Sequence, residues 1–314
     1  MGRISRKLNK LTRRMRSSSD NLSKKRRTEN HTADASLGPR LSIALQRKVQ
    51  LARTGINEKI GGQAFDRSQF DIVPLSLFVS DLDPAFHGYR IVQISDIHLG
   101  QWITPERLDG VVDLVNEQEP DLVAITGDCV SYVLDGLADD LGSSLAKLQP
   151  KDATVAVLGN HDHWMGAENI RSIYRLSHVI DLSNDVLTLR RGDAVLNIAG
   201  VDDVLVNRQR LDLVLKKLKS GGPAVLLAHE PDFAEISAKT GRFCLQLSGH
   251  SHGGQLVLPK IGTPIRGFMF GKYPLGRYQV GDMVQYTNRG LGTNLIWSRI
   301  NCPPEITVIT LKCP

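Results

Sequence analysis

"TVAVLGNHDHW", residues 154–164, joins a run of apolar residues to a run of polar ones. The apolar part has the length and composition of a buried strand, and Gly159 ends it. Four polar side chains follow without interruption: Asn160, His161, Asp162 and His163. Because amide, imidazole and carboxylate groups are all metal ligands, the stretch predicts a strand that ends at a functional site.

Four other apolar runs end in the same way. "RIVQIS" (90–95) leads into Asp96 and His98, "DLVAIT" (121–126) into Asp128, "AVLLA" (224–228) into His229, and "CLQLS" (244–248) into His250 and His252. A single Asp at a strand end is usually a turn former, and a lone His is usually an ordinary residue. Five such strand ends in one chain are not expected from turn chemistry alone. Since open α/β sheets place their sites at the carboxyl ends of strands, we expect these groups to converge.

The segments between these runs predict an α/β fold with layered sheets. Apolar residues at helical spacing follow Pro105, and further helices are expected near 138–148 and over 208–219. Two β-like runs, "VLTLRR" and "AVLNIAG", flank Gly192-Asp193, which is a hairpin turn pair. The chain ends in an alternating strand, "EITVITL". Strands that alternate with helices, followed by paired strands, indicate layered α/β architecture.

The donor set restricts the metal. Two Asp, one Asn and four His residues offer mixed oxygen and nitrogen ligands, which suit manganese, iron, zinc or cobalt. Seven ligands exceed one tetrahedral centre but suit two ions that share a carboxylate. Two such ions can clamp both oxygens of an in-line displacement and activate water, so the pattern predicts phosphoester hydrolysis.

Five blocks together resemble the calcineurin-like metallophosphoesterases. They are "SDIHLG" (95–100), "GDCV" (127–130), "GNHDHW" (159–164), "AHEPD" (228–232) and "SGHSHGGQ" (248–255). The C-terminal "YTNRGLGTNLIWSRINCPPEITVITL" is similar to one branch, the bacterial YkuE/YaeI-like phosphodiesterases. The resemblance implies a four-layer α/β/β/α sandwich of two mixed sheets and two divalent ions, with manganese favoured.

The resemblance also implies a role for each site residue. Asp96, His98 and His252 are expected to hold one metal, and Asn160, His229 and His250 the other. Asp128 is expected to bridge both metals. His161 is then the imidazole that protonates the leaving oxygen or holds a phosphate oxygen, and Asp162 is expected to orient it and raise its pKa.

Other residues near these motifs have weaker assignments. His163 and Trp164 either line the pocket or pack at the start of the next helix, and packing is favoured. Cys129 is expected to be a buried structural thiol, and the four scattered cysteines to be unpaired. Arg289 and Arg299 either grip a phosphate or form structural ion pairs. Residues 258–282 form either a substrate lid or an ordinary loop with a β-hairpin.

The basic character of the chain lies in its first residues. Residues 1–27 hold eleven Lys and Arg against Asp20, whereas the net charge of the whole chain is +6. Ile4, Leu8, Leu11 and Met15 recur at helical spacing, which is typical of a helix on an anionic membrane surface. A solvated tail and a nucleic-acid patch stay open as alternatives.

The expected organisation is a basic tail over residues 1–40, a helix and linker over 41–69, and a metallophosphoesterase domain over 70–314. No apolar run reaches the length of a membrane span, and no apolar region of a secretory signal follows the charged start. We therefore expect a cytoplasmic protein, peripheral at the inner face of the membrane if the tail binds lipid.

The sequence thus predicts a dinuclear phosphodiesterase or pyrophosphatase. The substrate is expected to be lipid-linked or nucleotide-linked, with UDP-2,3-diacylglucosamine as an example. A nuclease and a phosphoprotein phosphatase are the alternatives that use the same site. A non-catalytic binding scaffold is disfavoured, because Asp128 and His161 are both present.

Overall fold

The computed structural model describes residues 43–53, 64–219, 221–263, 271–294 and 298–314. The chain divides into two compact units, residues 1–45 and 46–314, and everything below concerns the second. The expected basic tail lies outside the described residues, as does most of the predicted linker. Residues 43–53 are helical, in agreement with the helix predicted there.

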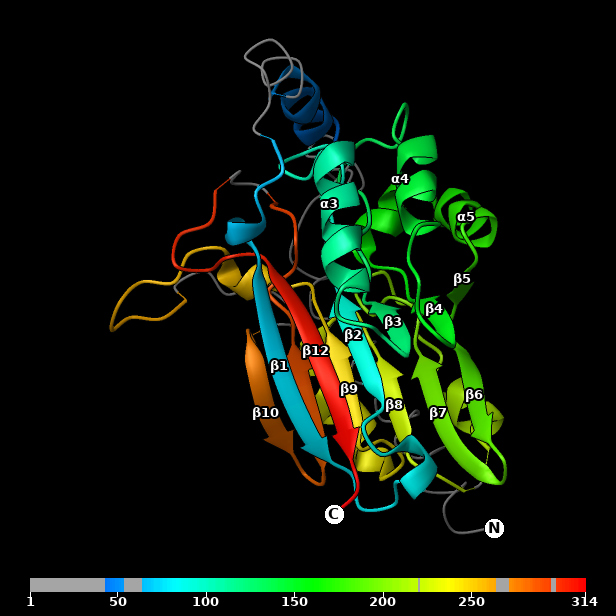
Figure 1. Ribbon diagram of the computed structural model, residues 1–314. Coiled ribbons are helices and arrows are strands. Elements are labelled where there is room, and N and C mark those ends of the chain that lie inside the picture. The colour runs from blue at the N-terminus through cyan, green and yellow to red at the C-terminus, as the bar shows by residue number, and fades with distance from the viewer. Residues whose placement is uncertain (1–42, 54–63, 220, 264–270, 295–297) are drawn as a thin grey trace, which may run out of the picture. The chain divides into compact units, whose positions relative to one another are not determined.

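Two six-stranded mixed sheets form the centre of the second unit (Figure 1). The first sheet has the order β1 (Asp71–Phe78), β12 (Glu305–Lys312), β2 (Arg90–Ile94), β3 (Leu122–Ile125), β4 (Ala153–Ala156) and β5 (Val179–Asp181). The second has the order β10 (Gly276–Val280), β11 (Met283–Thr287), β9 (Leu245–Ser248), β8 (Ala224–Leu227), β7 (Ala194–Gly200) and β6 (Asp185–Arg191).

Helices cover the outer face of each sheet. The first sheet carries α3 (Pro105–Asn116), α4 (Ala138–Leu145) and α5 (Asn160–Leu176), and the second carries α6 (Leu211–Lys217) and α7 (Ala234–Ser237). Helix α3 begins as predicted, because Pro105 occupies its first turn and the Thr104 side chain accepts a hydrogen bond from the Arg107 backbone. Helix α6 is shorter than the predicted 208–219.

Three apolar layers separate these elements. Alternate residues of β2 point to opposite faces, so Val92 packs under the helices of the first sheet and Ile91 packs between the sheets. Leu226 packs under α6 and α7. Strands covered on both faces must be apolar throughout, which explains the continuous hydrophobic runs. The predicted four-layer α/β/β/α sandwich is confirmed.

Strand direction brings the predicted strand ends together. Strands β2, β3 and β4 are mutually parallel, and so are β7, β8 and β9. Their carboxyl ends therefore lie at one edge of each sheet. The hairpin predicted at Gly192-Asp193 is confirmed by the antiparallel register of β6 with β7.

The segment proposed as a lid contains the antiparallel strand β10, but residues 264–270 lie outside the described part. Among the described residues, no helix is both long and apolar enough to cross a bilayer.

Candidate metal centre

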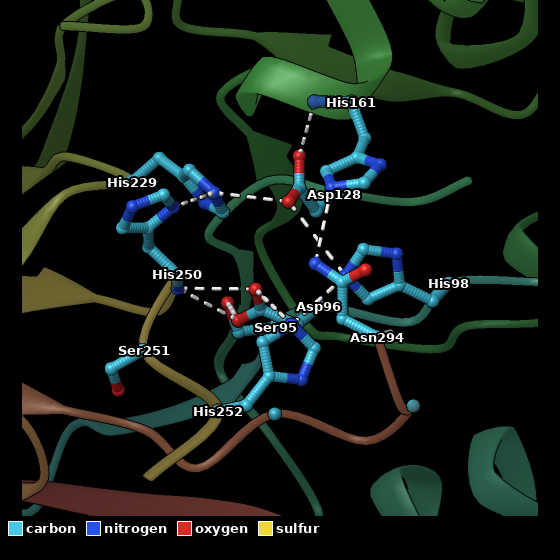
Figure 2. Close-up of polar contacts among 12 residues, drawn as sticks. Ser95, Asp96, His98, Asp128, His161, His229, His250, Ser251, His252 and Asn294 are labelled. Atoms are coloured by element: carbon cyan, nitrogen blue, oxygen red, sulfur yellow. Dashed lines mark hydrogen bonds and ion pairs between the residues drawn. The ribbon is translucent and has the colours of Figure 1, made fainter. Parts of the chain in front are cut away.

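The side chains predicted to converge do so at the carboxyl edge of both sheets. Asp96 and His98 follow β2, Asp128 follows β3, and Asn160 begins α5 directly after the β4 turn. From the second sheet, His229 follows β8, and His250 and His252 follow β9. Figure 2 shows the imidazoles and carboxylates of this set directed toward one another.

One group of ligand-type atoms comes from Asp96, His98 and His252, and these atoms all lie within 4.8 Å of one another. The Nε2 atoms of His98 and His252 are 3.0 Å apart. His252 Nε2 is also 3.4 Å from Asp96 Oδ1. All three side chains are buried.

A second group comes from Asp128, His229 and His250. Asp128 Oδ2 lies 3.2 Å from His229 Nε2, and His250 Nδ1 lies 3.3 Å from the same His229 nitrogen. Asp128 Oδ2 is in addition 3.7 Å from His98 Nε2, in the first group. A single carboxylate oxygen therefore faces both groups.

Two of the imidazoles are oriented by their second nitrogen. His229 Nδ1 is 2.7 Å from the carbonyl oxygen of Thr126, which can only accept, so Nδ1 carries the proton. His98 Nδ1 is 2.7 Å from Ser131 Oγ. In both residues Nε2 is left to face the centre, which is the arrangement found for metal-binding histidines.

The chemistry of the site fits divalent metal ions. Asn160 is 3% exposed, and within the described part of the chain its Oδ1 has no hydrogen-bond partner. A buried amide oxygen without a donor is costly, and a cation would satisfy it. The remaining donors are imidazole nitrogens and carboxylate oxygens, which suit first-row divalent ions.

The turns that carry these residues are strained. Asp96, His98, Asp128, His250 and His252 all have φ between 47° and 67°, in the left-handed region that side chains disfavour. Left-handed residues other than glycine cluster at functional sites, where surrounding contacts hold them in place. These residues follow the ends of β2, β3 and β9.

Two glycines allow the close approach of the carboxylates. A Cβ added at Gly159 would collide with Oδ1 of Asp128, and one added at Gly249 would collide with Oδ2 of Asp96. Each glycine belongs to a turn that follows a strand other than the one carrying the aspartate. The glycines that precede the polar runs in the sequence therefore make room for a ligand from a neighbouring strand.

Burial determines the charge of most imidazoles. It lowers the pKa of His98, His250 and His252, which keeps them neutral. Neutral imidazole is the form that binds metal. His229 differs: burial opposes its protonation, but the nearby Asp128 carboxylate raises its pKa well above the usual value.

His161 lies beside the centre, with hydrogen-bond partners other than the expected one. Its Nδ1 is 3.0 Å from the carbonyl oxygen of Ser131, its Nε2 is 3.3 Å from Asn294 Nδ2, and its backbone N–H donates to Asp128 Oδ1 at 2.8 Å. The carbonyl of Ser131 therefore orients the ring, in place of Asp162. Burial also lowers the pKa of His161, whereas the sequence predicted a raised one.

Asp162 instead holds the backbone of two turns. Its Oδ2 accepts N–H groups from Asp128 at 2.9 Å and Gly159 at 3.0 Å, and its Oδ1 accepts one from Cys129 at 2.9 Å. At the third position of α5 a carboxylate is also well placed for the helix dipole. The prediction that Asp162 orients His161 is wrong, because the Ser131 carbonyl holds His161 Nδ1 and no hydrogen bond among the described residues joins the Asp162 carboxyl to the His161 ring.

The residues with weaker assignments are also placed. Cys129 is buried against Tyr174, as expected, and all four cysteines are unpaired. His163 Nε2 lies within hydrogen-bond distance of Asp202 Oδ1, at 2.6 Å. Trp164 differs from the favoured expectation, because it is 38% exposed and its ring contacts that of His161.

Both arginines have structural roles. Arg289 pairs with Glu305 at 2.6 Å and Asp71 at 3.0 Å. Arg299 donates to the carbonyl oxygens of residues 289, 290 and 292. Neither guanidinium is directed to the centre in the way that a phosphate clamp requires.

Sequence reasoning missed Asn294 and Tyr132. Asn294 contacts His161 and accepts a hydrogen bond from the Tyr132 hydroxyl at 3.3 Å. Neither residue ends an apolar run, so no local pattern marks it. The only signal for Asn294 was its place in the C-terminal stretch that resembles the bacterial branch.

Comparison with known proteins agrees with this geometry. The profile of the calcineurin-like phosphoesterase family matches residues 89–254. Metallophosphoesterase YkuE of Bacillus subtilis is 37% identical over 72% of this chain and 80% of its own length. Phosphodiesterase YaeI of Escherichia coli is 28% identical over 71% of this chain and 82% of its own. Metallophosphoesterase YkoQ of Bacillus subtilis is 30% identical over 74% of this chain and 87% of its own length.

The expected likeness to the YkuE/YaeI-like branch is thus confirmed. A matched profile over half of the chain, a relative of similar length and three overlapping groups of metal-ligand atoms, one of which contains His98, Asp128 and His161, lead to one conclusion. The chain belongs to the calcineurin-like phosphoesterase family and is a metal-dependent phosphoester hydrolase.

Proposed function

We propose that the centre holds two divalent ions, with Asp128 shared between them. Asp96, His98 and His252 would hold the first ion, and Asn160, His229 and His250 the second. The observation that supports this most is Asp128 Oδ2, which faces His98 Nε2 at 3.7 Å and His229 Nε2 at 3.2 Å. The unpartnered oxygen of Asn160 supports the second set. We propose manganese as the preferred metal.

When bound, such ions supply a water of lowered pKa and neutralise charge on phosphate oxygens. The protein's own residues then position the substrate. We assign His161 Nε2 to the leaving oxygen or a phosphate oxygen, since Nδ1 is held by the Ser131 carbonyl. For this role the ring must take up a second proton at Nε2, because in the neutral ring the proton on Nδ1 leaves Nε2 as an acceptor. Asn294 donates to the same Nε2 and keeps the ring in place in the free protein.

We propose a phosphodiester or pyrophosphate as the substrate class, either lipid-linked or nucleotide-linked, such as UDP-2,3-diacylglucosamine. The name of YaeI, a phosphodiesterase, supports the diester. The basic residues 1–27 support a position at the inner face of an anionic membrane. Sedimentation with anionic and neutral vesicles, with and without residues 1–40, tests this position. If the tail instead confers salt-sensitive cleavage of nucleic acid, the enzyme is a nuclease.

The experiment for the centre combines activity with elemental analysis. Purified protein with Mn²⁺ is expected to hydrolyse bis(p-nitrophenyl) phosphate faster than p-nitrophenyl phosphate, and EDTA is expected to stop it. Asp128→Asn should lose activity and metal, while Asp113→Asn, an exposed carboxylate on α3, serves as the matched control.

His161→Ala separates metal binding from the proposed contact of His161 with the leaving oxygen or a phosphate oxygen. We expect it to lower turnover by about 10²- to 10⁴-fold, the usual contribution of a proton-transfer group, while two metal equivalents are retained. If His161→Ala strips the metals, the division between ligands and His161 is incorrect. If replete wild-type protein holds no stoichiometric metal, the proposed centre is incorrect as a whole.

A further inference from the structure

We propose that the exposed ring of Trp164, backed by the buried ring of Tyr132, forms a binding surface for a planar aromatic group attached to the phosphate of the substrate. This surface would select nucleotide-like or aryl phosphoesters over those with aliphatic substituents. The inference rests on the proposed function, because it takes the phosphate to lie at the metal centre beside His161.

Trp164 is unusual in its exposure. Its side chain is 38% exposed, although its ring centroid lies only 4.5 Å from that of His161, which is 2% exposed. Gly166, with a φ of 105°, interrupts α5 directly after this turn. Trp164 therefore sits on a short turn that also carries Asn160 and His161, with part of its ring left open at the edge of the centre.

The ring of Tyr132 also contacts the imidazole of His161. Its centroid is 4.9 Å from that of His161, and its ring is inclined by only 16° to that of Trp164, with 6.5 Å between their centroids. Two hydrogen bonds hold it in place, from its hydroxyl to Asn294 Oδ1 and from its backbone N–H to Gln50 Oε1. Tyr132 is only 6% exposed, so it supports the Trp164 and His161 rings from inside and leaves the stacking face to Trp164.

The surroundings favour a flat ring over an acyl chain. Polar groups lie beside the exposed ring. His163, next to Trp164, pairs with Asp202, and Asn294 lies at the hydroxyl of Tyr132. An acyl chain gains affinity from a long apolar surface, whereas an aromatic group gains it from one open ring face.

Product-like inhibitors test the surface without the effect of leaving-group reactivity. Inhibition constants of UMP, ribose 5-phosphate and octyl phosphate would be measured against bis(p-nitrophenyl) phosphate with the Mn²⁺-loaded full chain. We expect UMP to bind about tenfold more tightly than ribose 5-phosphate, the scale of one base–aromatic stack.

Variants of Trp164 test whether its ring causes the preference for UMP over ribose 5-phosphate. Trp164→Ala should reduce the ratio between the two constants to about one, and Trp164→Phe should retain most of it. The ratio is insensitive to the fraction of correctly folded protein. A wild-type ratio near one, a ratio unchanged in Trp164→Ala, or octyl phosphate binding that exceeds UMP binding and depends on Trp164 would each overturn the inference.

Failure of the proposed function has a different signature. In that case wild-type protein shows no EDTA-sensitive hydrolysis of bis(p-nitrophenyl) phosphate, so none of the inhibition constants can be measured. An active, metal-replete enzyme that does not distinguish UMP from ribose 5-phosphate leaves the metal centre intact and removes only the aromatic surface.

Discussion

Two ionisable side chains support the ligand-bearing turns in chemically opposite ways. Asp162 is a buried carboxyl group whose oxygens accept backbone N–H groups from the turns after β3 and β4, and burial and the nearby Asp128 raise its pKa to about 7. Arg299 is a partly exposed cation whose nitrogens donate to backbone carbonyls of residues 289–292. Arg299 also donates to the carbonyl of His252 at 3.4 Å.

The difference follows from how the strands end. A turn that leaves a sheet loses its ladder partners, so its buried N–H and C=O groups need others. The turns of the first sheet direct N–H groups inward, and only an acceptor can satisfy them. The C-terminal loop directs carbonyls inward, and only a donor can satisfy those. Neither side chain belongs to the proposed ligand set, yet each holds residues that do.

The largest effect is expected at Asp162. Asp162→Ala leaves at least three buried N–H groups without an acceptor, so we expect the free energy of unfolding to fall by about 3 kcal/mol or more. Urea denaturation of the metal-free protein measures this, with Asp113→Ala as the exposed control. A change no larger than that of the control would show that Asp162 does not support these turns.

A smaller effect is expected at Arg299. Water can replace part of what Arg299→Met removes, because the side chain is partly exposed and carbonyls tolerate a lost donor better than N–H groups tolerate a lost acceptor. We expect a loss of about 1–2 kcal/mol in the same denaturation experiment. Arg175→Met on α5 is the matched control. If Arg299→Met is more destabilising than Asp162→Ala, the comparison between the two side chains is reversed.

Metal affinity is a second measure by which Asp162 and Arg299 can be compared. Because Asp162 holds the backbone of Asp128, its replacement by Ala is expected to weaken metal binding by about 10- to 100-fold, the scale of lost supporting contacts. Arg299→Met is expected to weaken it less, through His252 alone. Competition with a fluorescent chelator at pH 7 measures the metal affinity of each variant. Equal affinities in wild type and Asp162→Ala would contradict the expected role of Asp162.

The last prediction concerns pH and the buried carboxyl group of Asp203. Burial and the neighbouring Glu230 carboxylate raise the pKa of Asp203, one of whose oxygens has no partner among the described residues. A raised carboxyl pKa means that the native state holds a proton that the unfolded state loses above about pH 4. The contribution of Asp203 to stability is therefore complete below pH 4 and is lost as pH rises toward the raised pKa.

Asp203→Asn imitates the protonated carboxyl group. It should therefore remove the decrease in the free energy of unfolding that Asp203 causes as pH rises. Wild type is expected to lose up to about 1.4 kcal/mol per pH unit relative to the variant between pH 6 and 7, the limit for one proton. Denaturation of both proteins in EDTA at several pH values measures it. Parallel pH profiles would show that Asp203 is ionised in the native state.

Sequence reasoning reached the fold and the strand ends because both depend on local pattern. Continuous apolar runs mark strands covered on two faces, and the first polar residues after each run mark the sheet edge. This was sufficient to predict an α/β fold with layered sheets and the meeting of Asp128 with His229 and His98. The four-layer sandwich was implied by the family resemblance. Sequence reasoning failed for Asp162, because adjacency to His161 in the chain suggested a contact that the helix geometry of α5 prevents.

The sequence by itself determined which groups stand at the edge of the sheets and which chemistry they can support. Only the tertiary structure decided which atoms face one another: that Ser131 orients His161, that Asp162 and Arg299 hold the turns, and that Trp164 is left open. The physical reason is how far apart along the chain the contacting residues lie. Strand and helix patterns arise from neighbours along the chain. The contacts of Ser131 with His161, of Asp162 with Cys129 and of Arg299 with His252 join residues 30 or more positions apart, and the exposure of Trp164 depends on what covers its side chain.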